Sequence, residues 1–297
     1  MTVDLAVATP AFIDVTYVGL EALPGPGEER FARDLLVSPG GGAITAIGAA
    51  RLGLATTLVA PLGTDGPGAL VARELERIGV GLPSARTKRT PVTTIMPVDG
   101  ERAMVTYDPG ARVTPAEVAA LEPRAVVAGM DQLELVPPGA RAYVSCGDDD
   151  ARRHAGRPPE QLRRARTLLV NRSEAFKLTG EADPEAAARR LGELAESVVL
   201  TLGPDGALAV VEGRLVRAQG FDVEPVVDTT GAGDLLAAAW AWAEGAGLDP
   251  EAGLRWAVLY AALSVTVPTG AAGAVARERL IEEGTRRGLP APPERSD

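Results

Sequence analysis

Four short apolar runs, separated by longer segments rich in Ala, Leu and Arg, constrain the fold of this chain most strongly. The runs cover residues 124–128, 142–145, 167–170 and 198–201. They lack the alternation of apolar and polar residues that is typical of a strand with one face in water. Strands buried on both faces and separated by helices indicate a mostly parallel sheet between two helical layers. We therefore predict a three-layer α/β/α core.

The size of the chain is consistent with one such core. The 297 residues are 46% hydrophobic and 24% charged, and a chain of this length buries roughly three-quarters of its unfolded surface on folding. The sequence contains no internal repeat and no low-complexity tract, and residues 290–297 have the composition of a loose tail. We predict a single domain that spans residues 1–297.

Two stretches interrupt the succession of buried strands and helices. Residues 14–38 contain a turn rich in Pro and Gly at positions 23–28. Residues 90–112 contain two extended segments, Val92–Val98 and Arg102–Tyr107, joined by Asp99-Gly100. Asp-Gly between extended segments predicts a β-hairpin. We expect these two stretches to be insertions in the core.

The segment Asp228-Thr-Thr-Gly-Ala-Gly-Asp234 is followed at once by an apolar run, which places small residues and a carboxylate at the start of a helix. Backbone N–H groups are unpaired there, and the helix dipole favours negative charge. Gly231 and Gly233 allow a ligand to approach the backbone, and Asp234 can take a proton from a hydroxyl beside a bound phosphate. The pattern predicts phosphoryl transfer to an alcohol. An ordinary capped helix start is the alternative interpretation.

Several other kinds of site are disfavoured by the sequence. The third glycine of a dinucleotide-binding fingerprint would fall on Leu236, and no Gly is followed by Lys-Ser or Lys-Thr as in a Walker A loop. His154 is the only histidine, which excludes a zinc site with several histidines and leaves one candidate for a Ser-His-Asp triad. Cys146 is the only cysteine, so no disulfide can form within the chain.

The charge and hydropathy patterns bear on partners and location. A net charge of -10 argues against a nucleic-acid partner, which requires a basic footprint. No apolar stretch approaches the length of a membrane span, and the N-terminal apolar stretch is interrupted by Thr9 and Pro10. We therefore expect a cytoplasmic protein with neither a membrane nor a nucleic-acid partner.

The segment 228–234 resembles the C-terminal signature of the ribokinase-like, PfkB-type carbohydrate kinases. The resemblance implies that Asp234 is the catalytic base and that Gly231, Ala232 and Gly233 form an anion hole for the transferred phosphoryl group. It also implies a ribokinase-like α/β/α core, with a small β-sheet lid built from about residues 14–38 and 90–112. In this family the lid often forms a dimer contact, so a homodimer through the lid is expected.

Residues 39–53 resemble the first signature of the same family, a Gly-Gly turn that leads into an Ala-rich helix ending in Arg-Leu-Gly. The resemblance implies that Gly40 and Gly41 line the sugar pocket and that Asp14 holds hydroxyl groups of the substrate. Ile44 stands where the family usually has an Asn. An aliphatic side chain leaves a facing hydroxyl unpaired. We therefore predict that ribose is disfavoured, and that the acceptor is a deoxy or otherwise modified sugar or a nucleoside.

Other segments extend the resemblance along most of the chain. Residues 62–80 resemble the family's G-x-D-x-x-G stretch, residues 170–180 its N-x-x-E motif, residues 198–207 its T-x-G-x-x-G segment, and residues 254–274 its adenine-side helix and loop. The resemblance assigns nucleotide binding to Asn171, Thr201, Gly203, Gly206 and Gly270. Glu174 is expected to hold Mg²⁺ through water, although a glutamate in the first turn of a helix is also favoured by the dipole alone. Asp228 matches the position of a monovalent-cation ligand, such as one for K⁺.

Together these features predict that the protein uses ATP and Mg²⁺ to phosphorylate a hydroxyl or hydroxymethyl group of a small sugar or sugar derivative. Two alternatives stay open. A nucleoside kinase of the same superfamily would stack a base against aromatic side chains, for which Phe12, Tyr17 and Tyr107 are the candidates. A non-catalytic relative that binds sugar or nucleotide is the other, and the presence of both Asp234 and Glu174 argues against it.

Overall fold

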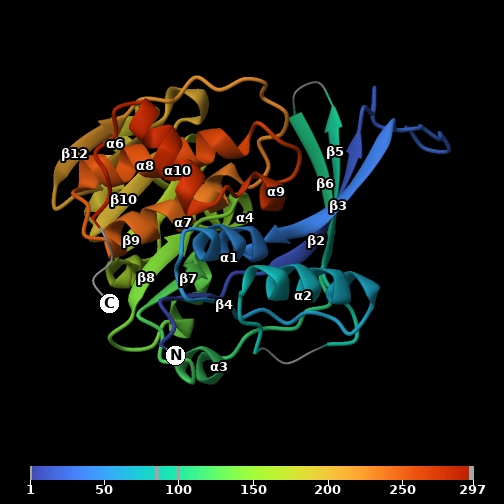
Figure 1. Ribbon diagram of the computed structural model, residues 1–297, viewed down its shortest axis with the longest axis horizontal. Coiled ribbons are helices and arrows are strands. Elements are labelled where there is room, and N and C mark those ends of the chain that lie inside the picture. The colour runs from blue at the N-terminus through green and yellow to red at the C-terminus, as the bar shows by residue number, and fades with distance from the viewer. Residues whose placement is uncertain (1, 84–86, 99–100, 294–297) are drawn as a thin grey trace.

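An eight-stranded sheet forms the centre of the molecule (Figure 1). The computed structural model describes residues 2–83, 87–98 and 101–293. The strand order is β12-β11-β10-β9-β8-β7-β1-β4, parallel from β10 to β4, with β11 and β12 antiparallel at one edge. The strands are β1 (Leu5–Val7), β4 (Thr56–Leu58), β7 (Ala125–Gly129), β8 (Arg141–Ser145), β9 (Thr167–Asn171), β10 (Ser197–Thr201), β11 (Ala207–Val211) and β12 (Arg214–Ala218).

Helices cover both faces of this sheet. One layer holds α1 (Gly42–Arg51), α2 (Gly66–Ile78), α7 (Ala232–Gly245), α8 (Pro250–Ser264), α9 (Gly270–Gly273) and α10 (Arg277–Arg286). The other holds α3 (Pro115–Ala119), α4 (Asp148–Arg153), α5 (Arg172–Thr179) and α6 (Pro184–Gly192), with 3₁₀ turns at Met130–Leu135 and Glu160–Arg164. A further 3₁₀ turn, Gly203–Asp205, follows β10.

Alternate residues of the parallel strands pack into two separate hydrophobic clusters. Val127 and Val199 belong to the cluster beneath α1, α7 and α8, whereas their neighbours Val126 and Val198 belong to the cluster on the opposite face. Both faces of each strand are therefore apolar, which explains why the strand sequences show no polar alternation. The predicted three-layer core is confirmed.

Helices α1 and α7 lie side by side and approach each other closely at a glycine. A Cβ atom added at Gly48 of α1 would lie 2.4 Å from Cδ2 of Leu235 and 3.3 Å from Cβ of Ala238, both on α7. On its other side α7 packs against α8, where the rings of Trp242 and Trp256 meet edge to face with centroids 6.2 Å apart. Tryptophan side chains thus pack between α7 and α8, and on the other side of α7 the side chains of Leu235 and Ala238 lie directly on the backbone of Gly48.

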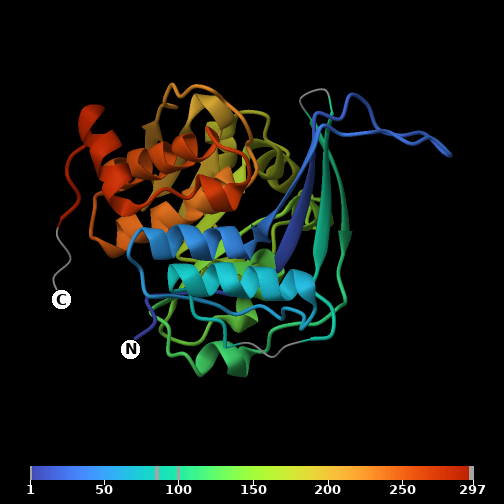
Figure 2. The same ribbon diagram turned by 45° about the vertical axis from the view of Figure 1, so that its right-hand side comes forward.

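A second, four-stranded sheet stands beside the α/β/α body (Figure 2). Its order is β3-β2-β5-β6, from strands β2 (Ala11–Val18), β3 (Asp34–Gly41), β5 (Val92–Val98) and β6 (Glu101–Tyr107). We call this sheet the lid. Strands β5 and β6 pair antiparallel as the sequence predicted, while the expected turn residues Asp99-Gly100 lie outside the described residues. The lid begins at Ala11, three positions before the predicted boundary at residue 14, because β2 continues almost directly from β1.

The two faces of the lid carry different side chains, although the face that bears Asp14 also carries Ile95 and the exposed Met104. Residues paired across neighbouring strands point to the same side of a sheet. On the face that bears Asp14, the cross-strand partners Ser38, Thr93 and Thr106 are polar, and Ser38 and Thr93 are buried. The opposite, outer face carries exposed apolar side chains: Tyr17, Leu35, Val37, Val105 and Tyr107.

Candidate active site

A cavity of about 860 Å³ opens at the carboxyl ends of the parallel strands, beside the lid. The last residues of four strands, Gly129, Ser145, Asn171 and Thr201, border it. Its other walls come from the start of α1 and the start of α7. Ligands of open α/β sheets bind at this end of the strands, so this is the position expected for a substrate site.

The loop before α7 has a backbone that requires glycine. Gly231 has φ 78° and precedes the first residue of α7, which is the left-handed region that glycine adopts most easily. A Cβ atom there would lie 2.9 Å from Cα of Gly270 and 2.9 Å from Cδ1 of Ile44. The loop is therefore packed against Ile44 and Gly270. Gly233 and Asp234, in the first turn of α7, border the cavity. The N–H groups in the first turn of a helix, together with the helix dipole, favour an anion.

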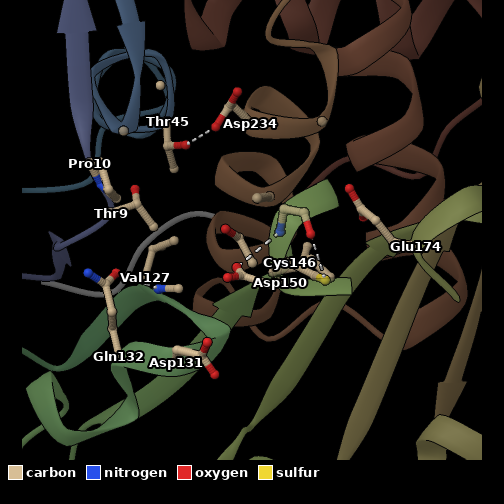
Figure 3. A pocket seen from close by; sticks show the side chains of 18 of the residues that line it. Thr9, Pro10, Thr45, Val127, Asp131, Gln132, Cys146, Asp150, Glu174 and Asp234 are labelled. Atoms are coloured by element: carbon tan, nitrogen blue, oxygen red, sulfur yellow. Dashed lines mark hydrogen bonds between the residues drawn. The ribbon is translucent and has the colours of Figure 1, made fainter. Parts of the chain in front are cut away.

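Asp234 lies in the first turn of α7 and borders the cavity (Figure 3). The hydroxyl of Thr45, on α1, donates a hydrogen bond of 3.0 Å to its Oδ1. Burial raises the pKa of Asp234 to about 6, while the hydrogen bond from Thr45 and the backbone N–H of Asp234 act in the opposite direction. A carboxylate with a pKa near 6 is ionised at neutral pH and accepts a proton more readily than an ordinary aspartate.

Asp228 joins two loops beneath the start of α7. Its Oδ1 accepts a hydrogen bond from the N–H of Thr230 at 2.8 Å, and its Oδ2 accepts one from the N–H of Thr269 at 3.0 Å. Thr269 has φ 69°, a conformation that is costly for a β-branched residue. The carboxylate of Asp228 therefore fixes the 228–231 loop to the loop before α9.

Asn171 and Glu174 form a reciprocal capping box at the start of α5. Oδ1 of Asn171 accepts from the N–H of Glu174 at 2.9 Å, and Oε2 of Glu174 accepts from the N–H of Asn171 at 2.8 Å. Both residues also border the cavity. Burial raises the pKa of Glu174 to about 7, the N–H of Asn171 lowers it, and the carboxylates of Asp148 and Asp150 raise it further. Glu174 therefore has the structural role at a helix start that the sequence left open, and it has this role at the edge of the cavity.

Asp14 packs on the Gly-Gly turn of the lid, and of these residues Gly41 borders the cavity whereas Asp14 and Gly40 lie behind its lining residues. Asp14 is 6% exposed, and a Cβ atom at Gly40 would lie 2.2 Å from its carboxylate. Gly41, with φ 56°, borders the cavity together with Thr9 and Phe12. The structure therefore brings Asp14, Gly40 and Gly41 to one place, with the Asp14 carboxylate packed directly on the glycine turn.

Ile44 has a different position from the one the sequence suggested. It is 1% exposed, and its side chain packs beneath Gly231 and Gly270 rather than on the cavity wall. Thr45, the next residue, borders the cavity instead. Successive helical residues point about 100° apart, so neighbouring positions of a helix face different surroundings. The prediction of substrate preference that was based on Ile44 therefore loses its geometric basis.

The residues expected to bind nucleotide are distributed along the same edge of the sheet. Thr201 borders the cavity at the end of β10. Gly203 and Gly206 have φ 66° and 98° and shape the turn that follows. A Cβ atom at Gly206 would lie 2.1 Å from the carbonyl oxygen of Ala218. Gly270, in contrast, supports the loop at Gly231 from below.

Known proteins provide independent information on this fold and site. A family model described as pfkB family carbohydrate kinase matches residues 146–276. Ribokinase from Bacillus subtilis is 30% identical over 274 residues, which is 88% of this chain and 92% of the relative. The chain belongs to the PfkB family of carbohydrate kinases. The sequence-based prediction of this family, and of an ATP-dependent sugar kinase within it, is confirmed.

Other members of the PfkB family match to different extents. A 1-phosphofructokinase from Haloferax volcanii is 42% identical over 103 residues, so the match spans only 33% of either chain. Among solved structures, ribokinase from Thermotoga maritima has a TM-score of 0.82 at 23% identity, covering 96% of this chain and 99% of that one. Ribokinase from Arabidopsis thaliana complexed with ribose and ATP has a TM-score of 0.79 at 24% identity, covering 95% and 98%. These structures confirm the ribokinase-like fold with its lid.

The structure of this PfkB kinase also brings residues to the cavity that sequence reasoning missed. Asp131, Gln132, Cys146 and Asp150 border it (Figure 3). All of them follow the carboxyl ends of β7 or β8 by a few residues, so their position after predicted parallel strands was the available signal. Thr45 had no such signal, because its contact with Asp234 joins two helices that are far apart in the sequence. No helix among the described residues is long and apolar enough to cross a membrane.

Proposed function

We propose that this kinase transfers the γ-phosphoryl group of ATP to a hydroxyl or hydroxymethyl group of a small sugar, with Asp234 as the general base. The observation that carries the proposal is the carboxylate of Asp234, which lies in the first turn of α7, borders the cavity and has a pKa of about 6. A general base works best when its pKa is near the working pH.

The proposed reaction uses the carboxylate of Asp234 and the backbone N–H groups at the start of α7 together. The acceptor hydroxyl gives its proton to Asp234 as its oxygen bonds to the γ-phosphorus, and the bond between that phosphorus and the β,γ-bridging oxygen breaks, so that ADP leaves. The N–H groups of Gly231, Ala232 and Gly233 are the proposed donors that stabilise the charge on the transferred phosphoryl oxygens, together with the helix dipole. Gly233 borders the cavity, and the N–H of Ala232 would exchange its 3.4 Å contact with the carbonyl oxygen of Thr229 for the phosphoryl group. Catalysis of this kind consists mostly of positioning and electrostatic stabilisation. The close packing of Gly231 on Ile44 and Gly270 keeps these donors in place.

Asn171 and Glu174 are the residues that we propose for Mg²⁺. The Glu174 carboxylate is 8% exposed, and its pKa is raised partly by Asp148 and Asp150, so a divalent cation beside it would relieve repulsion between the three carboxylates. Among the described residues, no group of three or more potential ligand side chains can hold an ion by itself. Mg²⁺ does not require such a group, because it takes one or two carboxylates together with water and substrate phosphates. The ion neutralises phosphate charge when it is bound.

The lid side of the cavity is the proposed acceptor site. Asp14 and the glycine turn at Gly40 and Gly41 would hold hydroxyl groups of the sugar, as the family resemblance implies. Two threonines on the Asp14 face of the lid support this assignment, because Thr106 borders the cavity and pairs with Thr93, Oγ1 to Oγ1, at 3.1 Å. The adenine nucleotide would lie toward Thr201, Gly203 and Gly206. The whole described chain would then act as one kinase domain.

Of the three aromatic candidates for stacking a nucleoside base, Phe12 borders the cavity. Tyr17 and Tyr107 lie on the outer face of the lid, on the side opposite to Asp14. A single ring is a weaker platform for a base than two. The arrangement therefore favours a sugar over a nucleoside as acceptor.

The outer face of the lid is the surface that we propose for a homodimer. Tyr17, Leu35, Val37, Val105 and Tyr107 form an exposed apolar face on a four-stranded sheet, and exposed apolar patches of this kind mark protein interfaces. Light scattering coupled to size-exclusion chromatography would measure the mass in solution. Val105→Glu should give a monomer if this face is the contact, and a monomeric wild-type protein would exclude the proposal.

The function itself is tested by measuring ADP release from Mg-ATP with a panel of neutral sugars, deoxy sugars and nucleosides. We expect one or more sugars to raise the rate far above the sugar-free rate in the wild type and not in Asp234→Asn. Parallel assays in K⁺ and Na⁺ salts would test a monovalent-cation requirement at Asp228. Tight binding of a sugar with no ADP release would instead support a binding protein.

A further inference from the structure

The hydrogen bond between Thr45 and Asp234 connects two helices, α1 and α7, whose relative position sets the geometry of the proposed reaction. Thr45 lies on α1, close after the Gly-Gly turn of the proposed sugar site, and Asp234 lies in the first turn of α7. Thr45 is 2% exposed, and its Oγ1 donates to Oδ1 of Asp234 at 3.0 Å. Figure 3 shows the two side chains pointing toward each other above the cavity. A threonine inside a helix often donates to a carbonyl of its own helix, whereas this hydroxyl donates to a carboxylate on another helix.

The surrounding packing shows that this contact is built into the junction of the two helices. Ile44, one residue earlier, supports the anion-hole loop at Gly231, and Gly48, one turn later, allows α1 to lie directly against Leu235. The backbones of α1 and α7 are therefore fixed on both sides of Thr45. The hydroxyl reaches Asp234 without a long, flexible side chain, which limits the entropy lost in holding it.

The hydrogen bond has two consequences for a general base. Because Thr45 donates to Oδ1, rotation of the carboxylate is restricted, and the remaining acceptor sites of the two oxygens are left to take the proton. A donor also stabilises the ionised carboxylate more than the protonated one, so the bond opposes the effect of burial on the pKa of Asp234. A base that was buried without such a donor would be protonated over a larger part of the neutral range.

We propose that Thr45 is a positioning residue for Asp234, which orients its carboxylate toward the acceptor hydroxyl and keeps it ionised at neutral pH. This inference rests on the proposed role of Asp234 as the base. Thr45 itself transfers no proton. Thr45 also borders the cavity, so this residue joins the sugar side of the proposed site to the phosphoryl side.

The kinetic test compares Thr45→Val with Thr45→Ser. Valine has nearly the same shape as threonine but no hydroxyl, whereas serine keeps the donor. We expect Thr45→Val to lower kcat by about tenfold, the usual effect of losing a hydrogen bond to a charged group, with KM for ATP unchanged. The acid limb of its pH–rate profile should move to higher pH. Thr45→Ser should restore most of the rate and the wild-type profile.

A second measurement does not depend on activity. The unfolding free energies of wild type, Thr45→Val, Asp234→Asn and the double variant are compared at pH 5 and pH 8. Because Thr45 stabilises the ionised form of Asp234, the coupling between the two residues should be larger at pH 8 than at pH 5. With Asp234→Asn the effect of Thr45→Val should no longer depend on pH.

These outcomes separate the inference from the proposed function. If Asp234→Asn abolishes activity but Thr45→Val changes neither the rate, the pH profile nor the coupling, the role of Thr45 is refuted and the base stands. If Asp234→Asn keeps wild-type turnover, the proposed base is wrong. Equal losses in Thr45→Val and Thr45→Ser would show that packing, not the hydroxyl, is what Thr45 contributes, and would also refute the inference.

Discussion

The N–H of Thr269 donates a hydrogen bond of 3.0 Å to Oδ2 of Asp228, on a loop 41 positions earlier in the chain. The other oxygen of the same carboxylate accepts from Thr230 at 2.8 Å, within its own loop. Asp228 therefore uses two different oxygens for two different loops. The anion-hole loop at Gly231 and the loop before α9 are fixed relative to each other by this one side chain.

Asp228→Asn should disrupt that connection, because an amide has one acceptor oxygen and presents its NH₂ group to the second N–H. We expect kcat to fall roughly tenfold and the thermal midpoint to fall, since a backbone donor loses its partner. Asp249→Asn is the matched control. The N–H groups of Glu251 and Ala252 both donate to Oδ1 of Asp249, so asparagine can replace it. Equal effects in both variants would contradict the two-loop role.

Asp234→Asn should lower kcat by on the order of 10²–10⁴, because asparagine has a similar shape but cannot take the acceptor proton. Nucleotide binding, measured by calorimetry, should change little. Asp183→Asn, at the start of α6, serves as a control, because Asp183 caps that helix through the N–H of Ala186 and is remote from the cavity. Wild-type turnover in Asp234→Asn would reduce this residue to a structural role.

At saturating Mg²⁺, which keeps Glu174 ionised, the rate should fall on the acid side of neutrality with a midpoint near pH 6, because Asp234 must be ionised to act and its pKa is raised to about 6. The stability effect has the opposite direction. A carboxyl whose pKa is raised on folding stabilises the fold in its protonated form, and this contribution is lost as pH rises from about 4 through 6. Chemical denaturation of wild type and Asp234→Asn across this range should show the wild type losing stability relative to the variant. Parallel curves would contradict the assigned pKa.

Glu174→Gln should raise the Mg²⁺ concentration needed for half-maximal rate, since a carboxylate holds a hard cation better than an amide. Glutamine can still accept the hydrogen bond from the N–H of Asn171, so stability should change little. Glu117→Gln provides the control, because Glu117 closes an equivalent capping box with Thr114 at the start of α3. Asn171→Ala is less informative, since it removes the helix cap as well. An unchanged Mg²⁺ dependence in Glu174→Gln would exclude the metal role.

Ile44→Asn should destabilise the protein rather than change its sugar preference. The amide would be buried beneath Gly231 and Gly270, where Ile44 now makes apolar contacts, and an unsatisfied buried amide costs about 1–3 kcal/mol. Ile44→Val is the size control and should cost about 1 kcal/mol. Denaturation curves and kcat/KM values for ribose, fructose and deoxy sugars would decide the matter. A changed order of preference with unchanged stability would return Ile44 to the sugar pocket.

The parallel core could be predicted from sequence because strands that are buried on both faces consist of continuous apolar runs. The predicted run at residues 198–201 differs by one residue from β10, and the run at 142–145 from β8. The β11–β12 hairpin was not predicted. Its two-residue turn is Glu212-Gly213, with φ 51° and 75°. Asn or Asp usually occupies the first position of such a turn, so the glutamate there gave no sequence signal for it.

The candidate site was predictable where a motif is local, and less so where helices meet. The capping box of Asn171 and Glu174 spans three residues and can be read from their spacing. The positions of Ile44 and Thr45 depend on how α1 is rotated against α7, which sequence spacing does not determine. That rotation is set by the glycine contact at Gly48, whose role appears only when both helices are present.

The packing of α1 on α7 also affects how the enzyme can be made. Thr45 and Asp234 are separated by 189 positions, so the base can reach its partner only after residue 234 has left the ribosome. Contacts this distant in sequence form late and slow folding. A nascent chain that carries the lid and the glycine turn but not yet α7 would therefore consume no ATP by phosphotransfer.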